Sequence, residues 1–403
     1  MRKRVVITGL GAVSPLGIGH QNFWENICAG KNGITDINYF DVSNFSIKKG
    51  GEIKDFDINN YFDSQKRYDQ LSRTCQFSLL ATKLAMEDAG LANHCDAKIG
   101  VCMGTTMGNQ SIIEDDLTSR LKYHSTQNNI EFYPSTNISA TVSKYLKASG
   151  PSITIPTACA AGNYAISYGA EMIKDEKVDM AYVGGADGLS RSCFALFHRL
   201  GAMSPDFCRP FDKNRQGMMV SEGAGVLVLE SLESALNRNA YIYAEIIGHG
   251  LSCDAYHSTA PHPEGLGATL AMLKALKSAN IKANEVSYIS AHGTGTKAND
   301  STESKALYRV FKEYTDRIPV SSLKSMIGHT MGAASGLEAI SSVLTIKNNT
   351  IPPTINYTCP DSDCIKNVVP NHKINKDINI VLSNSFAFGG NIGSIVLGDV
   401  NNE

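Results

Sequence analysis

The sequence predicts an α/β fold in which parallel sheets are covered by helices and the chain forms two similar halves. Short apolar, β-branched runs alternate with helical stretches along the whole chain, as expected for layered strands and helices. A strand followed by a glycine-containing turn occurs at residues 4–14 and again at 243–253. No Pro-, Gly- or Ser-rich linker separates residues 1–240 from 241–403, so we expect the halves to pack as one body.

Each element follows from its local pattern. In the helix expected at 72–89, for example, leucines share one face with Ala85, and Gly90 ends the helix. Predicted strands lie at residues 4–8, 99–103, 153–155, 180–185, 226–230, 243–248, 286–291, 320–322, 378–382 and 394–397. Predicted helices lie at residues 23–29, 72–89, 111–123, 134–145, 163–174, 232–237, 266–279, 300–311 and 333–346.

Composition narrows the class of protein. The 403 residues are 42% hydrophobic and 19% charged, as is usual for a globular enzyme with a large core. The net charge of −2 gives no overall positive potential that would attract nucleic acid or an anionic membrane. The basic N-terminus precedes too short an apolar run for a signal peptide, and no run is long enough to span a membrane. Ten cysteines without a Cys-x-x-Cys pair argue against a zinc site and indicate reduced thiols in a cytoplasm.

The stretch around Cys159 is the first candidate for chemistry. A β-branched strand stops at Pro156 and Thr157, and a helix begins from Ala158 onward. Cys159 therefore sits near a helix N-terminus, where the dipole and free N–H groups favour a thiolate, and we expect its pKa to fall below about 8.5. The same turn offers N–H groups to an oxyanion. The alternative interpretation is a small buried hydrophobe.

Three segments of the second half add polar groups. His292 ends a predicted strand before a Gly-Thr-Gly-Thr run, Lys324 and His329 precede a helix, and residues 386–393 are glycine-rich. A lone histidine is usually structural, but two histidines and a lysine in sparsely charged turns favour an active site. The turn at residues 9–14 nearly matches a dinucleotide fingerprint, but Ser14 replaces the third glycine, so we expect no such site.

Taken together, these motifs resemble the elongating β-ketoacyl-acyl-carrier-protein synthases of the thiolase-like superfamily, over nearly the whole chain. The matching motifs are Val-Val-Ile-Thr-Gly-Leu-Gly from Val5, Thr-Ala-Cys-Ala-Ala-Gly around Cys159, Arg-Pro-Phe-Asp-Lys-Asn-Arg from Arg209, Ser-Glu-Gly-Ala-Gly from Ser221, Asp-Ala-Tyr-His from Asp254, His-Gly-Thr-Gly-Thr from His292, Lys-Ser at Lys324, Gly-His at His329 and Phe-Gly-Gly from Phe388. The resemblance implies a layered αβαβα body whose N-terminal half (1–240) carries the cysteine and whose C-terminal half (241–403) carries the histidines and lysine.

The resemblance also implies a mechanism, decarboxylative Claisen condensation, without cofactor or catalytic metal. Cys159 would carry the acyl chain. Neutral His292 and His329 would donate hydrogen bonds to the malonyl thioester oxygen, and the N–H groups of Cys159 and Phe388 would hold the acyl oxyanion. Lys324 would fix the local hydrogen-bond network together with Glu303, and its charge would keep His329 neutral.

Further roles follow from the same resemblance. Phe388 would gate the entry of acyl chains, with the Asp254 loop as its partner. Thr294 and Thr296 would hold the pantetheine arm. Met107 would form the floor of the acyl pocket, with simple core packing as the alternative.

Basic residues would meet the partner of this reaction, an acidic acyl carrier protein that delivers acyl or malonyl groups. The candidates are Lys66, Arg67, Arg73 and Arg209, with a solvated surface as the alternative for each. The family dimerises through the sheet before the nucleophile. We therefore expect a homodimer, or a heterodimer with a chain-length-factor-like subunit.

Departures from the family pattern bear on the pathway. Ala387 replaces a glycine at the gate, Ser221 replaces a glycine, Gln216-Gly217-Met218 replaces Asp-Gly-Phe, and Asn163 is unusual after the nucleophile turn. They favour a specialised type II polyketide or aryl-polyene ketosynthase, with primary fatty-acid elongation as the alternative. A degradative thiolase would need a second C-terminal cysteine, which residues 386–393 lack, and a non-catalytic chain-length-factor-like subunit would lack the nucleophile.

Overall fold

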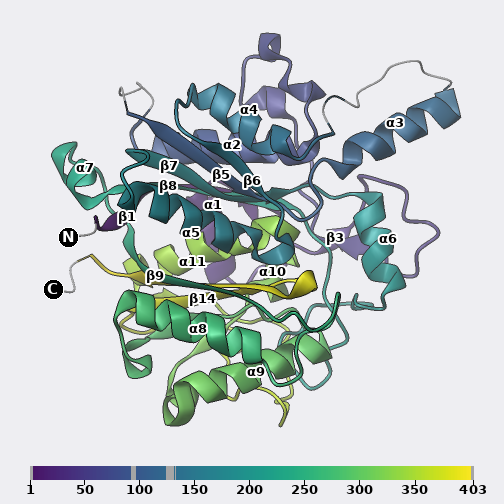
Figure 1. Cartoon of the computed structure of the whole chain (residues 1–403). Helices are drawn as coiled ribbons and strands as arrows, with labels where there is room; N and C mark the ends of the chain where they lie inside the picture. The colour runs from purple at the N-terminus through teal and green to yellow at the C-terminus, as the bar shows by residue number, and fades with distance from the viewer. Residues whose placement is uncertain (1–2, 92–96, 124–130, 132, 401–403) are drawn as a thin grey trace.

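The computed structural model describes residues 3–91, 97–123, 131 and 133–400, which fold into five layers. The helices are α1 (His20–Cys28), α2 (Arg73–Asp88), α3 (Gln110–Tyr123), α4 (Thr136–Leu146), α5 (Ala161–Lys174), α6 (Arg191–Arg199), α7 (Leu232–Asn237), α8 (Leu266–Ala279), α9 (Lys297–Phe311), α10 (Lys324–Ile327) and α11 (Ala334–Asn348). Helices α2 and α4 cover the upper sheet, α5 and α11 lie between the sheets, and α8 and α9 cover the lower sheet (Figure 1). The expected αβαβα layering is confirmed.

Each half contributes five strands to the layers. The upper half holds β1 (Val5–Ser14), β5 (Ile99–Gly104), β6 (Ser152–Ile155), β7 (Met180–Asp187) and β8 (Gly223–Ser231). The lower half holds β9 (Ala244–Cys253), β10 (Tyr288–Ser290), β11 (Val320–Ser321), β14 (Ile380–Phe386) and β15 (Asn391–Gly398). The strand order is β11-β10-β14-β15-β9-β1-β8-β7-β5-β6, with the halves joined where Val6 and Ile7 of β1 pair with Glu245 and Ala244 of β9.

The halves repeat one topology, and their sheets are mixed. Strands β6, β5 and β7 pair in parallel, as do β11, β10 and β14, but β8 and β1 in one half and β15 and β9 in the other pair antiparallel. The expectation of parallel sheets was therefore wrong for one strand of each half, β8 and β15, which runs opposite to both of its neighbours. Shorter pairs are β2 (Gly17–Ile18) on β1, β3 (Thr35–Asp36) with β4 (Lys49–Gly50), and β12 (Thr350–Ile351) with β13 (Ile374–Asn375).

The expected glycine turn after residue 8 is instead part of β1, which runs on to Ser14. Gly9 and Gly11 let α2 approach the strand: an added Cβ would lie 2.3 Å from the carbonyl oxygen of Ala85 and 1.8 Å from that of Ala81. The close packing of helix on strand, rather than a turn, explains these glycines.

The second half repeats this arrangement. Strand β9 continues to Cys253, and Gly248 and Gly250 face α8. A Cβ on Gly248 would lie 2.7 Å from the carbonyl oxygen of Ala275, and one on Gly250 would lie 2.0 Å from that of Ala271. The internal repeat that the sequence indicated is thus one of strand–helix packing, not of turns.

Most predicted helices lie within a few residues of the observed ones, and α7 and α8 coincide with their predicted ranges. Helix α6 was missed, although Ser190 caps it by accepting a hydrogen bond from the N–H of Cys193. Helix α11 is buried from Ala334 to Ile346, which its run of small and aliphatic residues permits between two sheets.

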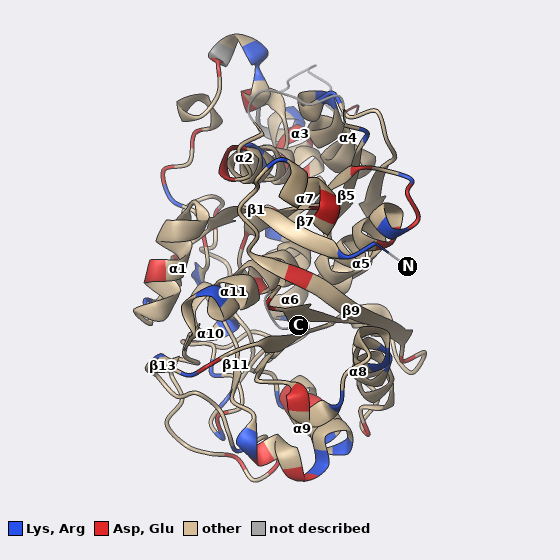
Figure 2. Ribbon diagram, turned by 90° about the vertical axis from the view of Figure 1, so that its left-hand side faces the viewer, with Lys and Arg blue, Asp and Glu red and all other residues tan. Residues whose placement is uncertain are grey.

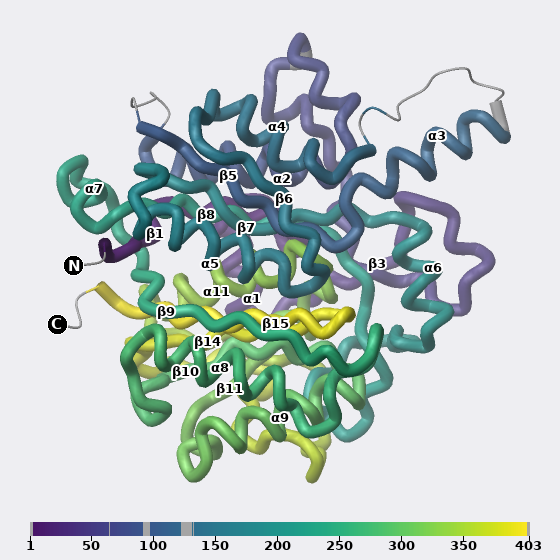
Figure 3. The backbone as a smooth tube through the Cα atoms, viewed as in Figure 1, coloured from purple at the N-terminus to yellow at the C-terminus, as the bar shows by residue number. Residues whose placement is uncertain are grey.

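Charged residues lie mainly on the outer helices and loops, with few on the central strands (Figure 2). Within the part of the chain that is described, no helix has both the length and the apolar character to cross a bilayer. The first and last described residues lie on one side of the molecule, opposite α3 and α6 (Figure 3).

Candidate active site

Cys159 occupies the predicted strand–turn–helix junction. Strand β6 ends at Ile155, and a 3-10 turn, η5 (Ala158–Ala160), leads into α5. Ala158 has a φ of 51°, an unusual conformation for a residue with a Cβ, which bends the chain sharply ahead of the cysteine. The carbonyl oxygen of Cys159 accepts a hydrogen bond of 3.4 Å from the hydroxyl of Ser385 in β14. The nucleophile candidate is thus held by both halves.

The expected lowering of the Cys159 pKa is wrong for this structure. Burial raises the pKa of the thiol to about 12, because a thiolate loses its hydration there, and the nearby Asp187 carboxylate adds to this; Lys324 acts in the opposite direction. Proximity to a helix N-terminus, on which the prediction rested, does not outweigh burial.

His292 and His329 face each other beside the cysteine, with ring centroids 5.4 Å apart and planes at 82°. Lys324 Nζ lies 3.3 Å from Nδ1 of His292, and the N–H of Met331 donates to Nδ1 of His329 at 3.1 Å. An ammonium and an N–H can only donate, so both Nδ1 atoms accept. Each neutral ring therefore carries its proton on Nε2.

Both histidines favour the neutral form. Burial lowers their pKa values well below the ordinary 6.5, and the positive charge of Lys324 lowers them further. The predicted effect of Lys324 on His329 is confirmed in direction, with burial as the larger cause.

The partner of Lys324 differs from the expectation. Its ammonium forms a buried ion pair with Glu338 of α11, whereas Glu303 accepts the N–H groups of His292 and Gly293 at 2.9 and 2.8 Å. Glu338 was missed because it lies inside a predicted helix, where an acidic residue gives no local signal for a buried ion pair. Glu303 instead fixes the backbone of the His292 loop, and burial raises its pKa to about 7.

The two threonines belong to the same loop. Their hydroxyls are 2.8 Å apart, and the buried carboxylate of Asp300 accepts the N–H groups of Thr294 and Gly295 at 3.0 and 3.2 Å. Arg215 is buried 3.7 Å from Asp300 and pairs with Asp361, which ties this loop to the Arg209 segment.

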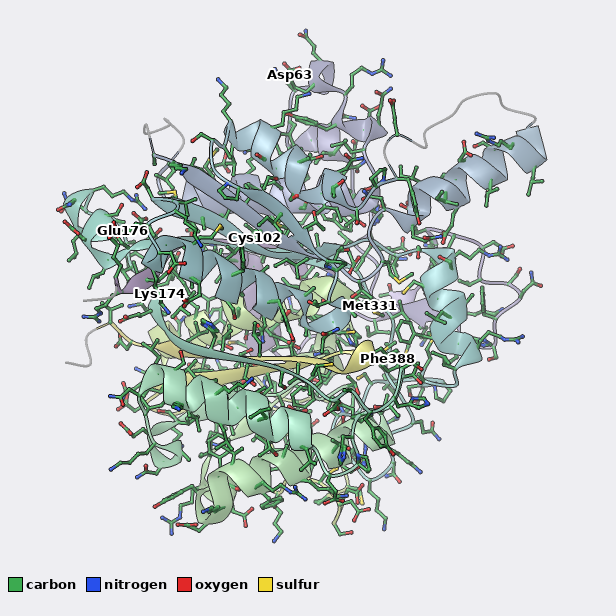
Figure 4. The ribbon with its side chains drawn as sticks, viewed as in Figure 1. Asp63, Cys102, Lys174, Glu176, Met331 and Phe388 are labelled. Carbon is green, nitrogen blue, oxygen red and sulfur yellow. The ribbon has the colours of Figure 1, made fainter. Side chains whose placement is uncertain are left out.

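These groups surround one cavity of about 660 Å³. Its lining includes Cys159, His292, His329, Thr294, Thr296, Phe388 and Phe197 of α6. Lys324 and Glu303 lie behind the histidines, while Met107 and Asp254 are outside the lining. In Figure 4, Met331 and Phe388 are labelled right of the centre of the view, at the level where the halves meet.

The Phe388 loop closes part of this cavity. Phe388 is 37% exposed and its ring centroid lies 5.7 Å from that of Phe197. Ala387 is extended, with a φ of −134°, so its side chain imposes no strain in this conformation. Gly389 has a φ of 82°, which favours glycine, and its N–H donates to the carbonyl oxygen of Ser258 at 2.8 Å.

Asp254 and Met107 support neighbouring loops. The carboxylate of Asp254 accepts the N–H groups of His262 and Gly267 at 2.9 and 3.0 Å, and its own N–H donates to Gly390 of the Phe388 loop. Met107 packs in a hydrophobic cluster with Phe194 of α6, the core packing that was the alternative interpretation.

The basic residues that were expected to meet a carrier protein differ in exposure and in ion pairing. Arg73 is nearly buried and forms a bidentate pair with Glu222 at 2.6 and 2.7 Å, so its expected role on the surface is wrong. Arg209 pairs with Asp206 and is partly exposed. Lys66 and Arg67 are exposed and line a second cavity, of about 830 Å³.

The departures from the family pattern fit the local structure. Ser221 donates to the carbonyl oxygen of Gly51 at 3.0 Å, and its N–H donates to the carbonyl oxygen of His329 at 3.0 Å. Asn163 donates from α5 to the carbonyl oxygens of Ser383 and Gly393 at 3.3 and 3.0 Å. Both therefore support the site from outside the cavity.

Comparison with known proteins identifies related chains. A family model described as the β-ketoacyl synthase N-terminal domain matches residues 2–235, and one described as the C-terminal domain matches residues 243–358. A 3-oxoacyl-[acyl-carrier-protein] synthase 2 from Synechocystis sp. is 40% identical over 401 residues, covering 96% of each chain. The solved ishigamide ketosynthase/chain length factor is 40% identical with a TM-score of 0.94 over 100% of both chains. A type II PKS ketosynthase, solved with its acyl-carrier protein and bound to the hexaketide, is 32% identical with a TM-score of 0.90 over 100% of both chains.

Proposed function

This chain belongs to the β-ketoacyl synthase family, and we propose from that premise that its cavity catalyses the decarboxylative condensation of malonyl and acyl groups delivered by an acyl carrier protein. One observation carries the proposal: Cys159, His292 and His329 line the same cavity, and both histidines are neutral rings whose Nε2–H groups can donate.

The first step is acyl transfer to the cysteine. The sulfur of Cys159 attacks the carbonyl carbon of the acyl thioester, an S–C bond forms, and the bond to the carrier's sulfur breaks. The thiol proton ends on the departing carrier thiol. The N–H groups of Cys159 and Phe388 would donate hydrogen bonds to the tetrahedral oxyanion.

The second step is decarboxylation. The malonyl thioester oxygen accepts hydrogen bonds from Nε2–H of His292 and His329 as the bond to the carboxylate breaks and carbon dioxide leaves. The bonding electrons pass to the enolate, whose oxygen the two donors stabilise. A neutral imidazole suits this task, because it donates a hydrogen bond without having to release a proton.

The third step joins the chains. The enolate carbon attacks the acyl carbonyl on Cys159, a C–C bond forms, and the sulfur leaves as a thiolate that then takes up a proton. The product is a β-ketoacyl chain, two carbons longer, on the carrier.

The remaining residues assist through position. Lys324 keeps Nδ1 of His292 as an acceptor, and Glu338 balances the lysine charge inside the core. Glu303 orients the His292 loop. Thr294 and Thr296 stand at the cavity wall, where hydroxyls suit the amides of a pantetheine arm, and Phe388 gates the entry.

For the pathway, we propose a specialised type II polyketide or aryl-polyene route. The ketosynthase/chain length factor at 40% identity and the type II PKS ketosynthase at 32% support it. The alternative, primary fatty-acid elongation, is supported by the 40% identical synthase 2 of Synechocystis.

The same reasoning extends to assembly. We propose a dimer, with a second copy or a chain-length-factor-like subunit, through β6, a partly exposed edge strand that precedes Cys159. The nine described cysteines are free, which supports a cytoplasmic location. We also propose that residues 1–240 and 241–403 are the two structural units.

Intact-mass spectrometry tests the proposal. The protein is incubated first with acyl carrier protein that bears either a saturated or a conjugated acyl chain, and then with malonyl carrier protein. Each incubation is carried out with the protein by itself and with the protein together with a chain-length-factor-like subunit. We expect an adduct on Cys159, a product two carbons longer, and neither with Cys159→Ala at unchanged thermal stability. A preference for conjugated chains supports the specialised pathway. Absence of any adduct under both conditions would refute the proposed condensation.

A further inference from the structure

A buried carboxylate outside the proposed mechanism joins two turns beside the cavity. Asp187 is the last residue of β7 and is 0% exposed. Its oxygens accept four hydrogen bonds: from the hydroxyl of Thr105 at 2.7 Å, and from the N–H groups of Thr106 at 2.7 Å, Met107 at 3.0 Å and Gly332 at 2.7 Å. No Lys or Arg of the described chain forms an ion pair with it, so its partners are backbone and hydroxyl donors alone.

The two turns are in direct contact. A Cβ on Gly332 would lie 2.5 Å from Cα of Thr105 and 2.7 Å from Oδ2 of Asp187. Glycine is therefore required where the turns cross, and the carboxylate lies within that crossing. A shift of one turn displaces the other, because the packing leaves no gap to absorb it.

The turn at Gly332 determines which ring nitrogen of His329 carries the proton. Met331 has a φ of 53°, a left-handed conformation that costs free energy for a residue with a Cβ. In this conformation its N–H reaches Nδ1 of His329 at 3.1 Å, and the next N–H, of Gly332, reaches Asp187. The bond to Asp187 offsets the backbone strain and holds the N–H of Met331 on the histidine.

We propose that Asp187 is a positioning residue that keeps His329 in its Nε2–H form, and thereby supports decarboxylation without touching the substrate. The inference rests on the proposed function of His329. A carboxylate is needed because all four of its partners are donors, whereas an amide would turn an NH2 group toward some of them.

The test compares Asp187→Asn with Asp88→Asn in the full-length protein. Asp88 is a matched control: its carboxylate is mostly buried, accepts the N–H of Leu10 at 2.8 Å and the hydroxyl of Tyr243 at 3.0 Å, and does not line the cavity. Two partial reactions are measured by mass spectrometry: acetyl transfer from acetyl carrier protein to Cys159, and conversion of malonyl to acetyl carrier protein. The 15N shifts of labelled histidine, with His329→Gln to assign the signal, report the tautomer.

We expect Asp187→Asn to lower decarboxylation about 100-fold, the size of effect that misplaced catalytic groups produce, while acetyl transfer is retained. The His329 signal should change from the Nε2–H form to a mixture. Asp88→Asn should lower the melting temperature and leave both reactions and the His329 signal unchanged.

If Asp187→Asn decarboxylates malonyl carrier protein at the rate of the wild type and the His329 tautomer is unchanged, the inference is overturned. Absence of decarboxylation in the wild type would instead refute the proposed function. If Asp187→Asn does not fold, Thr105→Val decides: it removes one donor to the carboxylate with little change in shape, and decarboxylation equal to wild type would overturn the inference.

Discussion

Replacing Lys324 by methionine separates the two tasks of the buried ion pair. Lys324 and Glu338 are each 1% exposed, and Oε2 of Glu338 has no hydrogen-bond partner in the described structure. Removal of the lysine leaves a buried carboxylate alone, which costs about 3–5 kcal/mol. With an unfolding entropy of about 2.1 cal/mol/K per residue, roughly 0.85 kcal/mol/K for the whole chain, the melting temperature should fall by about 4–6 °C.

The double variant Lys324→Met/Glu338→Met should regain this stability, because an apolar pair replaces two desolvated charges. It should not regain decarboxylation, because Nδ1 of His292 has still lost its donor and the ring proton is free to leave Nε2. We expect about 100-fold slower decarboxylation in both variants. Calorimetric melting and loss of malonyl carrier protein by mass spectrometry measure the two effects.

The stability deficit of the single variant should also shrink as pH falls. Burial raises the pKa of Glu338 from the ordinary value of 4.5 to about 7. Between 4.5 and the raised value the folded state binds more protons than the unfolded state, so its relative stability grows with acidification. A double variant no more stable than the single one, or one that decarboxylates normally, would refute this account of the pair.

Three further predictions concern the nucleophile and the gate. Because burial raises the pKa of Cys159 to about 12 and only the thiolate reacts, alkylation of Cys159 by iodoacetamide should rise about tenfold per pH unit from 7 to 10; a plateau near pH 8 in peptide mass spectrometry would contradict this. Phe388→Ala should shorten the lifetime of the acetyl-enzyme by admitting water, whereas Phe207→Ala, equally exposed at 38% but outside the cavity lining, should not. Ala387→Gly should lower the free energy of unfolding by about 0.4–1 kcal/mol in urea, because Ala387 has an ordinary backbone conformation and glycine only enlarges the unfolded ensemble; a more stable variant would reveal hidden strain.

Local pattern was sufficient for most elements of the fold. Helices α7 and α8 coincide with their predicted ranges, since amphipathic periodicity reports directly on burial. The glycines of β1 were misinterpreted because a glycine in a turn and a glycine under a helix look alike in sequence. Their role depends on α2, more than 60 residues further on, which the local pattern does not reveal.

The site divides in the same way. Motifs identified Cys159, His292 and His329, and the cavity does contain them together. The partner of Lys324 and the direction of the Cys159 pKa shift were wrong, because pairing and burial are properties of the assembled halves. Asp187 carries no local signal, being an acidic residue at the end of an apolar strand.

The position of α11 has a consequence for synthesis of the chain. Its apolar surface covers α5 between the sheets, yet it ends at Asn348, whereas α5 ends at Lys174. At about 5–20 residues per second, the ribosome needs roughly 9–35 s to add the intervening 174 residues (348 − 174). During that interval the face of α5 that α11 will cover stands open to water. The nascent first half therefore exposes an apolar surface that chaperones and other nascent chains can bind until translation is nearly complete.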